Sequence, residues 1–356
     1  MPTSVLRRTV SQVFMVGVPG PTLDPDTRSF LEEYRPGGVV LFKRNVQSAT
    51  QLRRLIADIH ALGSGVAPLV AIDHEGGRVD RLRLRPFTHF PAAAIVATSS
   101  ARVVREVAEA MGRELSAIGI DIDFAPVLDV WVNPRNEVIG DRAFGSTAAV
   151  VARLGVAAME GLLRGGVIPC GKHFPGHGRT RGDSHMVLPR IAASRATLSR
   201  TELVPFARAI RAGIPALMSA HVVYPALDPK HPATLSPAIA TTLLRKHLRF
   251  DGVLFSDDLE MQAVAGRLTP ERLAPAALGA GCDMLLACQS LEVARRAIAG
   301  LAGAIERGTV PTQRLLEAMG RIHALRRRIP AREANPRLGW PAHARLARRI
   351  LLSSVR

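Results

Sequence analysis

Cysteine is scarce in this chain of 356 residues, which contains only three. Cys170, Cys282 and Cys288 are an odd number, stand in apolar surroundings and form no CxxC pair. A disulfide framework needs paired cysteines and a structural zinc site needs closely spaced ligands, so the sequence disfavours both. A reducing compartment fits this pattern best, and we expect the protein to be cytoplasmic.

Long apolar runs are also missing, since none approaches the roughly 18 residues that a membrane-spanning helix needs. Residues 1–20 place two arginines before a short apolar run, as a signal peptide does. Glycine and proline interrupt this run and no small-residue cleavage site follows, so a first strand is the favoured interpretation. With 47% hydrophobic residues, the chain is expected to be globular and to have no membrane partner.

Negative charge is in short supply, and the formal net charge is +17 at pH 7. Arginine supplies nearly all of the positive charge, because lysine occurs only four times, and basic residues concentrate only in 321–350. Such a balance can indicate nucleic-acid binding. Aromatic residues make up only 4% and no nucleic-acid motif is present, so this partner is disfavoured, although the basic C-terminal segment keeps it open.

Eight short apolar runs alternate with segments of helical periodicity. The runs are 13–18, 38–42, 69–73, 122–127, 167–173, 216–221, 253–257 and 283–287. Near-continuous apolar strands separated by helices predict a parallel sheet covered by helices, an α/β fold. Eight such units in about 290 residues predict a single (β/α)8 barrel, with a doubly wound open sheet as the alternative.

No linker, low-complexity tract or repeat divides the chain, so residues 1–356 are expected to form one barrel domain. After about residue 309 the pattern predicts a terminal helix, an arginine-rich connection with prolines and a last helix. We expect this C-terminal helical extension to pack on the outside of the barrel.

Polar residues follow five of the predicted strands, at the points where the strands end. The segments are DHEGGRVDR from Asp73, DFAPVLDV from Asp123, KHFPGHG from Lys172, SAHVVY from Ser219 and SDDLEM from Ser256. Because the carboxyl ends of parallel strands meet at one mouth of a barrel, we expect a single site there.

Asp257 ends one of these strands, where its carboxylate would face both water and protein. Such a carboxylate can serve as a nucleophile, a base or a metal ligand. The alternative is that Asp257 or its neighbour Asp258 only caps the following helix. With two adjacent aspartates, one can cap while the other reacts.

The segment KHFPGHGRTRGDSH predicts a long exposed loop after another strand, because of its glycines and proline. Asp183 and His185 are two residues apart, so the carboxylate can hold the imidazole in one tautomer, as a proton shuttle needs. Solvated loop residues are one alternative, and a zinc site that adds His173 and His177 is another, disfavoured by its irregular spacing. Lys172 and His173 suit hydrogen bonds to the hydroxyl groups of a polar ligand.

Two further candidates stand in other predicted loops. Asp73 ends its strand just before the Gly76-Gly77 turn and points where a sugar or a metal would lie. Arg142 follows Asp141, and such a pair is often only a surface salt bridge of little energetic weight.

Five segments together carry a family resemblance: IDHEGGRV, GDRAF, KHFPGHGRTRGDSH, VLFSDDLEM and GAGCDMLLAC, in that order. They resemble the family 3 glycoside hydrolases, specifically the single-domain β-N-acetylhexosaminidases of bacterial cell-wall recycling. The resemblance covers about residues 10 to 300, and the Asp-Ser-His ending of the long histidine motif marks this subgroup. One position departs from the pattern, since His74 stands where the family usually has glutamine.

The resemblance implies a retaining exo-β-N-acetylglucosaminidase on a (β/α)8 barrel, with no metal or organic cofactor. The expected substrate is a carbohydrate, a GlcNAc-1,6-anhydro-MurNAc muropeptide or disaccharide of peptidoglycan recycling. By this resemblance Asp257 forms the covalent glycosyl-enzyme, and His185 with its partner Asp183 is the acid/base. The hydroxyl and acetamido groups of the sugar would be held by Asp73, Arg142, Lys172 and His173.

Other functions remain as alternatives to hydrolysis of such a sugar. One is a phosphorylase of the same superfamily, because a histidine acid/base does not repel an incoming phosphate. Another is a β-glucosidase of the same superfamily. The non-enzymatic alternative is a sugar- or nucleic-acid-binding protein on a degenerate barrel.

Overall fold

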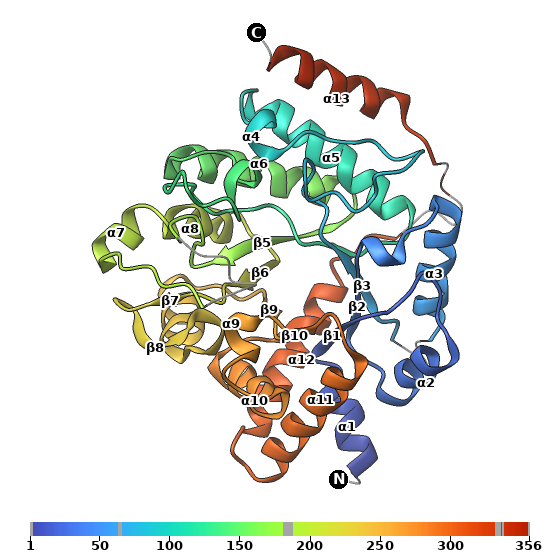
Figure 1. Cartoon of the computed structure of the whole chain (residues 1–356), viewed down its shortest axis with the longest axis vertical. Coiled ribbons are helices and arrows are strands. Elements are labelled where there is room, and N and C mark those ends of the chain that lie inside the picture. Colours follow the sequence, from blue (N-terminus) through green and yellow to red (C-terminus); the bar gives the residue numbers. More distant parts are fainter. Residues whose placement is uncertain (1–2, 63–65, 181–187, 332–335, 337, 355–356) are drawn as a thin grey trace.

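A closed barrel of eight parallel strands forms the centre of the computed structural model, which describes residues 3–62, 66–180, 188–331, 336 and 338–354. Helices surround this barrel (Figure 1). Its strands are β1 Phe14–Gly17, β2 Gly38–Leu41, β3 Leu69–Ile72, β4 Ile122–Asp123, β5 Ile168–Phe174, β6 Ala216–Ser219, β9 Val253–Asp258 and β10 Met284–Ala287. The pairing of β1 with β10 closes the sheet. The predicted (β/α)8 fold is therefore confirmed, and the open-sheet alternative is wrong.

Each predicted strand is present, although several end earlier than the apolar pattern indicated. The largest difference is at β4, predicted over 122–127 and observed over Ile122–Asp123. Pro126 has no N–H group to donate to a strand ladder, and the chain leaves regular pairing before it. A small antiparallel sheet of β7 Val223–Tyr224 and β8 Asp228–Pro232 was not predicted.

The helices between the strands bury one face each against the barrel. In α5 this face contains Val104, Val107, Met111 and Leu115, all of which are buried. The longer helices are α1 Thr3–Ser11, α2 Pro25–Tyr34, α3 Ala49–Ala61, α5 Ala101–Ala117, α6 Ala148–Arg164, α8 Leu203–Arg211, α10 Pro270–Ala280, α11 Leu291–Glu306, α12 Thr312–Arg326 and α13 Pro341–Ser353. The other helical elements are α4 Ala93–Val96, α7 Arg195–Arg200, α9 Gln262–Ala265, η1 Lys43–Asn45, η2 Gly140–Arg142, η3 Ala233–Leu235 and the π-helix η4 Ala238–His247.

The last helix, α13, lies outermost in the fold and packs against α4 and α5 (Figure 1). It buries Ala347 and Ile350, and Nδ1 of His343 lies 2.8 Å from the buried Glu114 carboxylate of α5. The division of the chain into one barrel domain and a C-terminal extension stays a prediction.

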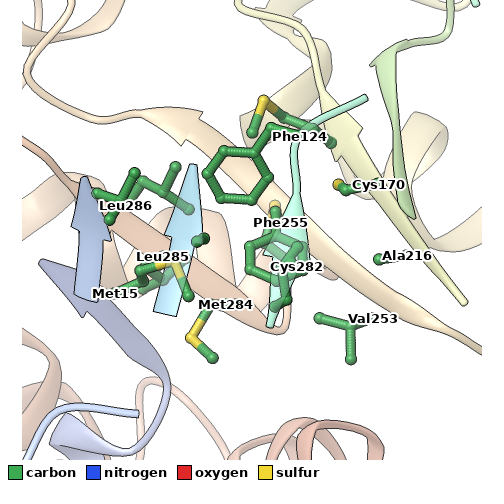
Figure 2. Packing of buried hydrophobic residues seen from close by; sticks show 14 of the residues in the cluster. Met15, Phe124, Cys170, Ala216, Val253, Phe255, Cys282, Met284, Leu285 and Leu286 are labelled. Carbon is green, nitrogen blue, oxygen red and sulfur yellow. The ribbon is translucent and has the colours of Figure 1, made fainter. Parts of the chain in front are cut away.

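Apolar side chains fill the inside of the barrel. Figure 2 shows Phe124 and Phe255 at its centre, with ring centroids 5.4 Å apart in an edge-to-face arrangement. All three cysteines are buried and free. Such a filled barrel leaves only its two ends for polar chemistry. No helix in the described part of the chain has the length and apolar character needed to span a bilayer.

Candidate active site

A cavity of about 350 Å³ lies at the carboxyl ends of the barrel strands. Its lining includes residues at or just beyond the ends of β2, β3, β5, β9 and β10, where a (β/α)8 barrel places functional groups. The structure brings five of the seven predicted site residues together in this lining: Asp73, Arg142, Lys172, His173 and Asp257. The other two, Asp183 and His185, lie outside the described residues.

Two adjacent aspartates at the end of β9 take different surroundings. Asp257 accepts a hydrogen bond from the backbone N–H of Asp258 at 2.8 Å. The Asp258 carboxylate accepts backbone N–H groups of Glu260 at 3.1 Å and Cys288 at 3.2 Å, so it binds the turn after β9 and the end of β10. Burial raises the pKa of Asp258 to about 6. The helix that follows, α9, begins after Met261 and has no side-chain cap, so the expectation that one aspartate caps it is wrong. Both aspartates line the cavity.

Lys172 and Arg142 reach the cavity from different elements and share a carboxylate, Glu75. Lys172, at the end of β5, places Nζ 2.5 Å from Asp73 and 2.6 Å from Glu75. Arg142, in η2, binds both oxygens of Glu75 through Nε and Nη2 at 2.7 Å each. Arg142 therefore does not form the surface pair with Asp141 that its sequence position suggested. That pair exists between Asp141 and the half-exposed Arg78.

The charges of this network offset the cost of burial. Burial alone would raise the pKa of Glu75, but the charges of Arg142 and Lys172 outweigh it and hold that pKa well below its usual range. Burial alone would lower the pKa of Lys172, but Asp73 and Glu75 raise it above the ordinary value. Glu75, Lys172 and Arg142 therefore stay charged at neutral pH.

Asp129 holds the two histidines that follow β5. Its Oδ2 lies 2.7 Å from Nδ1 of His173, and its Oδ1 accepts the backbone N–H groups of His173 at 3.2 Å and His177 at 2.6 Å. Because Nδ1 of His173 donates to Asp129, its Nε2 is the ring atom left for a ligand in the cavity. Burial, then the neighbouring His173, lowers the pKa of His177 to about 4, so His177 is neutral.

In the residues that the structure describes, no three histidine, cysteine, aspartate or glutamate side chains lie together so as to hold a metal ion. His177 instead contacts Thr180 through Nδ1 at 3.0 Å.

Sequence reasoning missed Glu75, Asp129 and Arg81, all of which contact predicted site residues. Arg81 lines the cavity with a guanidinium nitrogen 3.8 Å from the Asp73 carboxylate. Electrostatics could have indicated Glu75. Two buried cations, Lys172 and Arg142, need more than one carboxylate nearby, and Glu75 stands two residues after Asp73. Asp129 is partner to a histidine on the neighbouring strand, a contact that spacing along the chain does not reveal.

At two of the five polar strand ends, the first polar residue is buried and does not line the cavity. Asp123 is fully buried and accepts the backbone N–H of His74 at 2.9 Å. Ser219 is buried beside Thr234, with the two hydroxyl oxygens 2.8 Å apart. The cavity receives the apolar Phe124 and Met218 from these two strands instead.

His74, the departure from the family pattern, points away from the cavity. Its side chain is 2% exposed, and Nδ1 lies 3.3 Å from Asp80. Burial lowers the pKa of His74, which favours the neutral ring. His74 is absent from the cavity lining, so the substitution leaves the polar groups around Asp73 in place.

The chain is similar in sequence to a glycosyl hydrolase family and to proteins named β-hexosaminidase. Residues 5–325 match the family model described as the glycosyl hydrolase family 3 N-terminal domain. A β-hexosaminidase of Chromobacterium violaceum is 44% identical over 296 residues, which are 81% of this chain and 82% of that protein. A β-hexosaminidase of Methylococcus capsulatus is 41% identical over 316 residues, covering 86% of this chain and 91% of the relative.

Solved structures give the same picture. The family 3 β-N-acetylglucosaminidase from a Paenibacillus species superposes with a TM-score of 0.93 at 38% identity, covering 98% of this chain and 68% of that chain. The NagZ protein of Neisseria gonorrhoeae in complex with N-trifluoroacetyl-D-glucosamine superposes with a TM-score of 0.74 at 34% identity. That match covers 88% of this chain and 97% of the Neisseria chain.

Proposed function

We propose that this chain, which belongs to glycosyl hydrolase family 3 as a β-N-acetylhexosaminidase, removes terminal β-linked N-acetylglucosamine with retention of configuration. One observation carries this proposal: Asp257 shares a cavity with the cations Lys172 and Arg142 and the acceptor Asp73. A nucleophilic carboxylate next to convergent sugar-binding groups is what a retaining glycosidase requires.

The chemistry takes two steps in this proposal. The Asp257 carboxylate attacks the anomeric carbon and forms an ester bond, while His185 donates a proton to the departing glycosidic oxygen. His185 then removes a proton from water, the water oxygen attacks the anomeric carbon, and Asp257 leaves as a carboxylate. Asp183 holds the His185 ring and stabilises its charged form. The roles of His185 and Asp183 rest on the sequence motif and the family.

Four other residues would bind the sugar. Asp73 accepts hydrogen bonds from hydroxyl groups, and Lys172 and Arg142 donate to hydroxyl and acetamido oxygens. His173 meets the sugar through Nε2, because Asp129 occupies Nδ1. The cavity volume of about 350 Å³ lies within the usual range for small-molecule sites.

The proposed natural substrate is a GlcNAc-1,6-anhydro-MurNAc muropeptide or disaccharide of peptidoglycan recycling in the cytoplasm. The sequence motifs support this substrate, together with three buried free cysteines that suit a reducing compartment. Phosphorolysis is the second candidate reaction, since a histidine acid/base does not repel a phosphate anion.

Release of p-nitrophenol tests the proposal, with the β-N-acetylglucosaminide and the β-glucoside as substrates, each with and without phosphate and EDTA. We expect selective, EDTA-resistant hydrolysis of the first compound, and loss of turnover in Asp257→Ala and His185→Ala that remain folded. Sugar 1-phosphate formed on addition of phosphate would identify a phosphorylase. An Asp257→Ala protein that retains activity would rule out the assigned nucleophile.

A further inference from the structure

Glu75 is the one described carboxylate that contacts both cations of the cavity wall. Its side chain is 4% exposed, while those of Lys172 and Arg142 are 3% and 12% exposed. Oε1 accepts from Lys172 at 2.6 Å and from Arg142 at 2.7 Å, and Oε2 accepts from Arg142 at 2.7 Å. The two cations come from β5 and η2, which are separate in the chain, so Glu75 fixes their relative position.

Counting donors shows what these contacts leave for a ligand. The Lys172 ammonium has three N–H donors, and its contacts with Asp73 and Glu75 occupy two of them. The Arg142 guanidinium has five, of which Glu75 takes two and the carbonyl of Val138 takes one. Among the described contacts, one donor of Lys172 and two of Arg142 remain, and both side chains line the cavity.

The charges around the cavity also indicate that Glu75 is needed. Two cations that are almost wholly buried need nearby negative charge, because removing one partner of a buried ion pair leaves an uncompensated charge. Asp73 forms ion pairs with Lys172 and Arg81, whereas the carboxylate paired with Arg142 is that of Glu75. With a neutral residue at position 75, Arg142 would lose its bidentate partner and be able to turn.

We propose that Glu75 is a positioning residue: it aims the remaining donors of Lys172 and Arg142 at the oxygen acceptors of a bound N-acetylated sugar. This inference rests on the proposed function, since it takes the cavity as the sugar site. Glu75 lines the cavity, but both of its carboxylate oxygens accept from Lys172 or Arg142, so we expect its effect to pass through the two cations. It should therefore act mainly on sugar affinity.

Glu75→Gln tests this inference because it keeps the shape of the side chain and removes the charge. We expect KM for p-nitrophenyl β-N-acetylglucosaminide to rise about tenfold or more, with a smaller fall in kcat. Calorimetry should show a similar loss of affinity for free N-acetylglucosamine. Glu75→Asp keeps the charge but is too short to bridge both cations, so partial recovery is expected. Glu109→Gln, which removes the carboxylate of the Arg113 pair on α5, is the matched control.

A double variant separates positioning from a general structural role. If Glu75 acts through Arg142, then Glu75→Gln should weaken binding much less in an Arg142→Met background than in the wild type. Equal losses in both backgrounds would overturn the inference, as would a folded Glu75→Gln protein with wild-type KM and sugar affinity. If Glu75→Gln does not fold, Glu75→Asp decides by the same two measurements. A wild type that binds N-acetylglucosamine but hydrolyses no hexosaminide would defeat the proposed function, and the binding comparison would still judge Glu75.

Discussion

At the scale of single residues, Asp129 controls how His173 meets a ligand. Its carboxylate accepts from the ring Nδ1 and from two backbone N–H groups. In Asp129→Asn the amide can turn its NH2 group toward the ring, which favours the opposite tautomer. We expect kcat/KM to fall about a hundredfold or more, by analogy with other histidines that lose an orienting carboxylate. Nitrogen NMR of the histidine rings would report the tautomer.

The matched control for this substitution is Asp228→Asn. Asp228 likewise binds a ring Nδ1, that of His231 at 3.1 Å, and the backbone N–H groups of Lys230 and His231. That pair lies on β8, away from the cavity lining, so kcat/KM should not change. Wild-type activity and an unchanged His173 tautomer in Asp129→Asn would contradict the role given to Asp129.

Asp258 provides a prediction about pH. Burial raises its pKa to about 6 in the folded protein, above the ordinary value of 3.8, so between these two pH values the folded state keeps a proton that the unfolded chain has lost. The contribution of Asp258 to stability is present below about pH 4 and is lost as pH rises through 6. The stability of Asp258→Asn relative to wild type should therefore rise by about 2 kcal/mol between pH 4 and pH 7, measured by urea unfolding.

The opposite sign is expected at Asp228, which serves as the comparison. Burial would raise its pKa, but hydrogen bonds from Ser236, Lys230 and His231 lower it to about 2. Its contribution to stability is present above pH 4 and disappears as pH falls through 2. Asp258→Asn and Asp228→Asn with the same pH trend would show that burial does not set the pKa of Asp258.

At the scale of elements, Asp283 joins α12 to the amino-terminal end of the barrel. It is fully buried just before β10, and arginines 245, 314 and 321 contact its two oxygens at 2.5, 2.5 and 3.2 Å. Asp283→Asn would leave three cations around a neutral amide. We expect a loss of about 3–5 kcal/mol in the free energy of unfolding and an unchanged KM, since the proposed sugar site lies at the opposite end of the barrel.

Two outcomes test this reading of Asp283. The exposed pair of Glu271 and Arg296 is the control, and Glu271→Gln should leave the unfolding midpoint unchanged. A stability loss in Asp283→Asn that is no larger than in this control would mean that packing alone holds α12 in place. A raised KM would connect α12 to the cavity.

Elements are also where sequence reasoning reached furthest. The eight barrel strands were predicted from apolar runs of five to seven residues between helices, a strong local pattern that identified even β4, which ends early at Asp123. The sequence did not predict the sheet of β7 and β8, because the DPKHP segment of β8 combines two prolines with charged residues, which disfavour strands. The sequence located the polar residues Asp73, Lys172, His173 and Asp257, which lie at or near strand ends and line the cavity. It did not locate Glu75 and Asp129, whose contacts depend on the closed barrel.

At the scale of the whole molecule, the excess of arginine gives the protein a positive electrostatic potential. A net charge of +17 attracts anions over distances near the Debye length, which salt shortens. A muropeptide carries carboxylates, whereas p-nitrophenyl β-N-acetylglucosaminide is neutral. We therefore expect kcat/KM for a muropeptide to fall several-fold between about 10 and 300 mM NaCl, while the neutral substrate changes little. Electrostatic attraction acts on the charged muropeptide and not on the neutral substrate, so it would make their salt dependences differ. Equal salt dependence for both substrates would therefore show that the positive charge has no part in capturing the substrate.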